Sequence, residues 1–314
     1  MRRSCCFLNL SLLSLLPFSI SSTCASARDE ATFYLAGGLR TGHFRTGVGS
    51  FHHSPFQFES HLSWAEVQAY EVLAGVNYVN RDNIYFRGYA DYGGVRHGRF
   101  KDSDFIKVRC GDDIEVSDAR ADTPSGELFD LSGGIGYNFG FLSGRINVSP
   151  LFGYSYHVQN FNMKNLFLRR DILNQDEGAI AGMNSSYKAR WTSPWLGVDF
   201  TFRMTRCWSL IGGGEYHWAR YRAKGHWNLH RDLSHPFRQT AWGYGQLYRL
   251  GLNGSFVFAE RRWSCGILGI YERWKTQSGR NKTFIRGFDE PLRSKMLPVH
   301  WYSWSWMVNI QYYY

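Results

Sequence analysis

The sequence predicts an all-β protein, a ten-stranded antiparallel transmembrane β-barrel. Three observations carry this prediction: an aromatic- and glycine-rich composition, segments of two-residue periodicity, and alternation of short turns with long polar stretches. The 314 residues include 17% aromatic residues, 33 Gly and only 8 Pro. A mean hydropathy of −0.37 excludes a bundle of membrane helices, since each span needs about 20 nearly uncharged apolar residues. A barrel fits, because only every second strand residue meets lipid.

The N-terminus has the three parts of a secretory signal. Arg2 and Arg3 precede an apolar stretch over residues 7–20, and small residues end at Ala27. We predict a signal peptide over residues 1–27 and a single barrel domain over residues 28–314. The formal net charge of +10 favours anionic partners. For an exported chain, these are outer-membrane lipid and lipopolysaccharide rather than nucleic acid.

The last strand has the clearest period. Alternate positions from residue 302 to 312 are aromatic or aliphatic, whereas the intervening ones are mostly polar. This alternation is typical of a strand with one lipid-facing side, although a soluble β-sandwich would bury the same face. Residues 196–202, 210–218 and 250–258 repeat the pattern. We also expect an aromatic girdle at the membrane boundary, formed by Trp301, Trp304 and Trp306.

Short and long connections alternate between these segments. The short turns are expected at residues 80–83, 140–143, 204–206 and 259–261, and the long polar loops at 43–57, 101–125, 158–184, 222–240 and 276–297. Five long loops and four short turns predict ten strands with both termini on the periplasmic side. The strands exceed the ~10 residues needed to cross, so we expect the barrel to project above the membrane. The inward residues are expected to form a polar plug that includes Asp199, Arg203, Glu215 and His217.

Cysteine usage indicates neither a disulfide scaffold nor a metal centre. Once the signal peptide is removed, Cys110, Cys207 and Cys265 remain, so at most one internal disulfide can form. No Cys-x-x-Cys pair is present. We therefore expect no metal ligand and no metal or organic cofactor.

Several segments resemble the omptin family of outer-membrane proteases, which are ten-stranded barrels. The matching segments are Ser60-His61-Leu62-Ser63-Trp64, Ala74-Gly75-Val76-Asn77, Gly98 to Phe105, Ser186 to Arg190 and Pro194-Trp195-Leu196-Gly197. The resemblance extends over nearly the whole mature chain and implies a surface-exposed endopeptidase. It also makes lipopolysaccharide the one candidate requirement for activity.

The resemblance implies catalytic roles for Asp102, Asp104, Asn228 and His230. Two carboxylates two residues apart on a strand point to one side and tend to share a proton, which lets them activate water. Opposite this pair, His230 matches the family's base. Asn228 stands where the family has the aspartate that orients the base, and it cannot stabilise an imidazolium by charge. Asp232 is an alternative partner for His230.

Two further sites follow from the resemblance. Thr46 and His226 fall on the substrate-binding positions where the family has acidic residues, so a preference for basic side chains is not expected. Tyr154 and Arg190 match lipopolysaccharide-binding positions, and an arginine can pair with a phosphate through two hydrogen bonds. Alternatively, Arg190 only extends toward lipid headgroups.

The sequence therefore predicts an outer-membrane barrel of a Gram-negative bacterium, located there after signal-peptide cleavage. Its first candidate function is endopeptidase activity on a peptide or protein, with an aspartate pair and a histidine activating water. The alternative is a non-catalytic barrel acting as a porin, adhesin or surface scaffold. Ten strands leave a lumen filled by side chains, which weighs against a porin.

Overall fold

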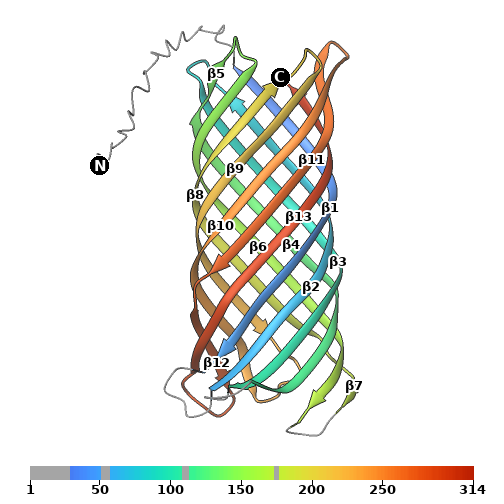
Figure 1. Cartoon of the computed structure of the whole chain (residues 1–314), viewed down its shortest axis with the longest axis vertical. Helices are drawn as coiled ribbons and strands as arrows, with labels where there is room; N and C mark the ends of the chain where they lie inside the picture. Colours follow the sequence, from blue (N-terminus) through green and yellow to red (C-terminus); the bar gives the residue numbers. More distant parts are fainter. Residues whose placement is uncertain (1–28, 51–56, 108–112, 173–176) are drawn as a thin grey trace, which may run out of the picture.

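The chain forms one closed cylinder of tilted antiparallel strands (Figure 1). The computed structural model describes residues 29–50, 57–107, 113–172 and 177–314. The predicted signal peptide and Cys110 lie outside the described residues. Within these ranges, no helix is long and apolar enough to cross a membrane.

The described residues form thirteen strands, and ten of them are long. The long strands are β1 (Glu30–Gly49), β2 (Gln57–Val79), β3 (Ile84–Lys107), β4 (Ile114–Tyr137), β6 (Ile146–Asp171), β8 (Ser185–Arg203), β9 (Trp208–His226), β10 (Leu233–Phe258), β11 (Arg261–Thr276) and β13 (Leu292–Tyr313). The short ones are β5 (Phe139–Phe141), β7 (Gly178–Ile180) and β12 (Gly279–Ile285).

Each long strand pairs with its sequence neighbour, and β1 also pairs with β13. The closing ladder runs from Thr32 opposite Tyr313 to Gly49 opposite Lys295. The ring leaves no long strand with a free edge, as the interior of a bilayer requires. The predicted ten-stranded up-and-down barrel is confirmed. Strand β1 begins and β13 ends at the same end, which also carries the short turns and is called the turn end; the opposite end is the loop end.

The four short turns lie where the sequence predicts them, but the long loops are much shorter than expected. Residues 101–107 belong to β3 and residues 114–125 to β4, with Lys101 opposite Arg120. The stretch 276–297 contains a further strand, β12, that pairs with β10 and β13. Above the membrane, water bathes the outer face, so a strand there needs no apolar face. Polar stretches can therefore continue the ladder.

The outer face carries the predicted apolar band. On β13, Trp304, Trp306 and Val308 are 52%, 62% and 70% exposed, and they alternate with buried residues. The prediction for Trp301 was wrong, because this side chain is only 1% exposed. It lies three residues before Trp304, and an odd spacing on a strand places two side chains on opposite faces.

Inside the barrel, the loop half is packed with aromatic side chains. The aromatic cluster comprises Phe44, Trp64, Phe100, Phe161, Tyr187, Phe237 and Trp301, all buried. Trp64 lies at its centre, with its ring 4.9 Å from that of Tyr187 and 5.5 Å from that of Phe161. Glycines make room for such rings: a Cβ on Gly42 would lie 2.3 Å from Trp301. The lumen is therefore a packed core at this level.

Two buried charged networks lie nearer the turn end. In the first, the Arg40 guanidinium is 2.6 Å from Glu71, 2.6 Å from Asp91 and 2.8 Å from Asp130, and 3.8 Å from Glu272.

The second network joins two arginines to two carboxylates. Arg87 is 2.6 Å from Asp199 and 2.7 Å from Glu215, and Arg249 is 3.0 and 3.1 Å from the same pair. His217 adds a contact of 3.2 Å to Glu215. Three of the four expected plug residues thus form this network; Arg203 lies instead at the turn end, where it donates a hydrogen bond to the carbonyl of Gly144.

The Arg40 network yields a stability prediction. Arg40→Met should lower the free energy of unfolding by about 3–5 kcal/mol, because it leaves buried carboxylates without their counter-charge. Urea unfolding of the refolded barrel in detergent micelles measures this change. The matched control is Arg81→Gln, since the exposed Arg81 lies 3.8 Å from Asp29; its effect should stay within about 0.5 kcal/mol. Equal midpoints for the two variants would contradict the prediction.

Candidate active site

The aspartate pair lies on β3 at the loop end. Asp102 is opposite Leu62 of β2 and Asp104 is opposite Ser60, and both positions share the inward face with Phe100. The Ser60 hydroxyl donates a hydrogen bond of 2.9 Å to Oδ1 of Asp102. The two carboxylates therefore stand above the aromatic cluster, facing the mouth of the barrel.

Both carboxylic acids in the mouth hold their protons more tightly than usual. Burial and the neighbouring charge of Asp104 raise the pKa of Asp102 to about 7. Burial also raises the pKa of Asp104, and a hydrogen bond with the Ser60 side chain opposes this rise. A carboxyl pair of this kind can hold one proton near neutral pH, which is the state needed to take and return protons on a bound water.

His230 lies in the turn that joins β9 to β10. The anchor of this turn is Trp227, whose ring is 5.2 Å from Phe237 and 6.2 Å from Phe100. Phe100 precedes Asp102 by two residues on the same face of β3. The backbone N–H of His230 donates to the carbonyl of Trp227 at 3.3 Å. Packing of Trp227 thus fixes the His230 turn over the strand that carries the aspartates.

The carboxylate beside His230 belongs to Asp232. Nδ1 of His230 is 3.6 Å from Oδ1 of Asp232, and both side chains are largely exposed. The amide of Asn228 points elsewhere: Oδ1 accepts from the Asn184 backbone and from the Ser185 hydroxyl, and Nδ2 donates to the Gly182 carbonyl. Asn228 therefore connects the β9–β10 turn to the segment 182–185 through hydrogen bonds, and none of its hydrogen bonds goes to His230.

The structure does not bring the two predicted substrate-binding residues together. Thr46 is buried inside the barrel at 4% exposure. His226 is exposed at the end of β9, where the inward positions are 219, 221, 223 and 225, so it faces outward. The residue of this segment that packs inward is Trp227, whose ring contacts those of Phe100 and Phe237 and whose role was not predicted from the sequence.

The outer wall below the loop end carries a basic face on β8, β9 and β10. Its members are Lys188, Arg190, Arg220, Arg222, Lys224 and Arg238. Arg190 is directly opposite Arg222, and Lys224 is opposite both Lys188 and Arg238. Like charges directly opposite one another destabilise a sheet. Within the described part of the chain, none of these six side chains forms an ion pair with a carboxylate that would offset the repulsion.

The predicted Tyr154 and Arg190 are both exposed, but they do not adjoin. Tyr154 is opposite Pro194, four residues before the position that faces Arg190, which separates them by ~13 Å along the strands. The basic face was not predicted from the sequence, although the basic residues Arg220, Arg222 and Lys224 at alternate positions of one strand could have indicated it.

The fold and its apolar band define an outer-membrane β-barrel of a Gram-negative bacterium. Residues 35–314 match the model of the Protochlamydia outer membrane protein family, and the chain belongs to this family. None of the curated proteins matches it. Among solved structures, the Escherichia coli outer membrane protease OmpT is similar, with 14% identity, coverage of 91% of this chain and 97% of that one, and a TM-score of 0.73.

This similarity to OmpT confirms the predicted omptin-like fold. The Pseudomonas aeruginosa outer membrane protein OprG covers 90% of this chain and 95% of its own at 10% identity, with a TM-score of only 0.31. In outer-membrane β-barrels generally, the short turns face the periplasm and the longer connections face outward. The loop end is accordingly the extracellular mouth, and the turn end faces the periplasm.

The geometry of the aspartate pair predicts opposite pKa changes in two variants. Asp104→Asn should lower the pKa of Asp102 from about 7, because it removes a neighbouring negative charge. Ser60→Ala should raise it, because the lost hydrogen bond stabilises the ionised carboxylate. The carboxyl ¹³C chemical shift, titrated in micelles, measures both. Shifts of the same sign in both variants would refute the arrangement.

A linked effect on stability has a definite sign. Folded Asp102 keeps its proton up to a pH of about 7, whereas an unfolded aspartate loses it near a pH of about 4. The contribution of this group to stability therefore falls as pH rises through that window. Asp102→Asn should flatten this part of the stability profile.

Proposed function

We propose that this barrel is a surface endopeptidase in which Asp102, Asp104 and His230 activate a water molecule at the extracellular mouth. The aspartate pair holds the water and manages its protons. Neutral His230 accepts a proton as the water attacks a peptide carbonyl, and Asp232 orients the ring and stabilises the imidazolium. Asn228 holds the turn that carries both residues.

One observation carries this proposal. The loop end places the aspartate pair, with the Ser60 hydroxyl donating to Asp102, beside the turn that carries His230, whose Trp227 ring lies 6.2 Å from that of Phe100, two residues before Asp102. The carboxylate of Asp232, 3.6 Å from the His230 imidazole, supplies the negative charge that Asn228 lacks. Perturbed carboxyl groups that converge with a histidine in an open mouth are typical of catalytic sites.

The aromatic cluster supports the endopeptidase over the porin alternative. Trp64 and its neighbours fill the lumen immediately below the aspartate pair. A substrate would therefore remain at the mouth, where a flexible segment of another protein can reach it. A non-catalytic adhesin or scaffold stays as the alternative that the following experiment distinguishes.

The endopeptidase proposal predicts graded losses of activity. With the barrel refolded in lipopolysaccharide-containing micelles and given a mixed peptide library, Asp102→Asn, Asp104→Asn and His230→Gln should each reduce cleavage about 100-fold or more. The cleavage rate of Asp232→Asn should lie between the rates of these variants and that of the unchanged protein. The control is Asp82→Asn, an exposed carboxylate on the short turn between β2 and β3 at the opposite end of the barrel, and this variant should cleave peptides at the normal rate.

Mass spectrometry of the products locates the cleaved bonds. If the unchanged protein cleaves no peptide while retaining its heat-modifiable migration, the barrel is a scaffold or adhesin. Equal cleavage by the His230→Gln variant would also refute the assigned role of the histidine.

We further propose that the basic face binds phosphates of lipopolysaccharide in the outer leaflet. Its opposed pairs, such as Arg190 and Arg222, lack carboxylate partners in the described chain. A dianionic group bound between two such side chains would reduce the repulsion between their positive charges. Arg220 lies over the ring of the exposed Trp242 at 5.6 Å, which places the charged face beside an aromatic boundary residue. Arginines form the strongest pairs with phosphate.

This binding proposal predicts less co-purified lipopolysaccharide. Arg190→Gln/Arg222→Gln should retain several-fold less lipid phosphate per barrel, and added lipopolysaccharide should raise its thermal midpoint less. Arg81→Gln/Arg261→Gln, at two exposed positions of the turn end, serves as the charge-matched control. Equal phosphate content in all three proteins would refute this assignment.

A further inference from the structure

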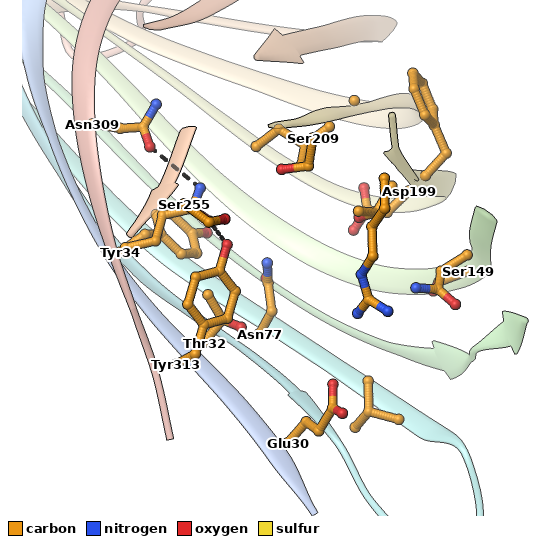
Figure 2. Close-up of a pocket in the computed structure, with 18 of the residues that line it drawn as sticks. Glu30, Thr32, Tyr34, Asn77, Ser149, Asp199, Ser209, Ser255, Asn309 and Tyr313 are labelled. Atoms are coloured by element: carbon orange, nitrogen blue, oxygen red, sulfur yellow. Dashed lines mark hydrogen bonds between the residues drawn. The ribbon is translucent and has the colours of Figure 1, made fainter. Parts of the chain in front are cut away.

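We propose that the periplasmic end of the barrel is a binding site for a small organic anion, one with a carboxylate or phosphate head and a short apolar body. The site is the cavity at the turn end, whose volume is about 270 Å³ (Figure 2). It is separated from the candidate active site by both charged networks and the aromatic cluster. The proposal is therefore independent of the endopeptidase.

The floor of this cavity is electrically balanced. Arg87 and Arg249 lie there with Asp199, whose carboxylate accepts hydrogen bonds from both arginines and one of 2.8 Å from the Tyr85 hydroxyl. The remaining carboxylate of the network is Glu215, which contacts the same arginines. The two positive and two negative charges cancel, so the floor attracts neither sign strongly and forms a rigid base.

The rim is not balanced. It is lined by Arg203, Arg206 and Arg262. Apart from Asp199 in the floor, Glu30 is the only carboxylate among the lining residues. Within the described residues, none of the three arginines forms an ion pair: Arg203 donates to a backbone carbonyl, and Arg262 lies 4.5 Å from the centre of the Tyr313 ring. The rim therefore carries excess positive charge around a concave space that attracts an anion.

An unused donor lies deeper in the wall. Asn309 is 3% exposed and lines the cavity; its Oδ1 accepts a hydrogen bond from Gln311, but its Nδ2 has no partner in the described structure. Figure 2 shows Asn309 and Asp199 around the same space. A buried amide donor without a partner costs free energy, which a ligand oxygen or water would recover.

Apolar side chains complete the wall and define the body of the ligand. Ile211, Trp208 and Leu268 line the cavity together with the polar groups. A few convergent polar groups in a partly apolar cavity are typical of sites for small organic molecules. A free inorganic ion would leave these apolar surfaces in contact with water, so an anion with an aromatic or short aliphatic body fits best.

The test titrates three small aromatic probes into the barrel in nanodiscs. Benzoate and phenyl phosphate carry the two head groups, and benzamide is the neutral control; calorimetry measures the dissociation constants, with empty nanodiscs as the blank. At least one anion should bind about tenfold or more tightly than benzamide. The preferred anion identifies the head group. If neither anion binds better than benzamide, the proposal fails.

Variants locate the binding. Arg203→Gln/Arg262→Gln should weaken anion binding about tenfold or more, as loss of charge-assisted hydrogen bonds predicts. The matched control is Arg81→Gln/Arg261→Gln, whose two exposed arginines lie at the same end of the barrel but do not line the cavity. Equal weakening by the control, or none by the double variant, would overturn the assignment. Heat-modifiable migration verifies that each variant is folded, and peptide cleavage by the double variant should be unchanged.

Discussion

The pairing of β1 with β13 is the constraint on which the rest of the molecule depends. It closes the sheet, so backbone hydrogen-bonding groups in the bilayer find partners within the ring. In the closed sheet, each strand side chain points either outward or into the lumen. The outward set meets lipid, and the inward set must fill a narrow lumen. Every other feature of the barrel is a consequence of this division.

The inward side chains form distinct levels along the axis. From the periplasm, an open basic cavity is followed by the networks around Arg87 and Arg40, then by the aromatic cluster around Trp64. The aspartate pair and His230 lie above that cluster. The packed middle separates the two ends of the barrel, so the two sites proposed above are independent of each other.

The sequence predicted the strands where lipid imposes an apolar face, as in residues 302–312. It failed above the membrane, where polar residues 114–125 carry no such period but still continue the ladder. The spacing of Asp102 and Asp104 was enough to place them on one face. Asp232 was also predicted from the sequence as an alternative partner of His230, and the two side chains lie 3.6 Å apart. The contribution of Trp227 was not predictable, because it depends on the backbone geometry of a turn that no two-residue period describes.

The Arg40 network also bears on how the protein reaches the membrane. Its members come from β1, β2, β3, β4 and β11, and Glu272 is separated from Arg40 by most of the chain. A half-inserted sheet would expose the guanidinium without its last partner to lipid. The Arg40 guanidinium therefore acquires its full set of carboxylate partners only after β11 has joined the sheet, so this network links the first strands of the chain to one of the last.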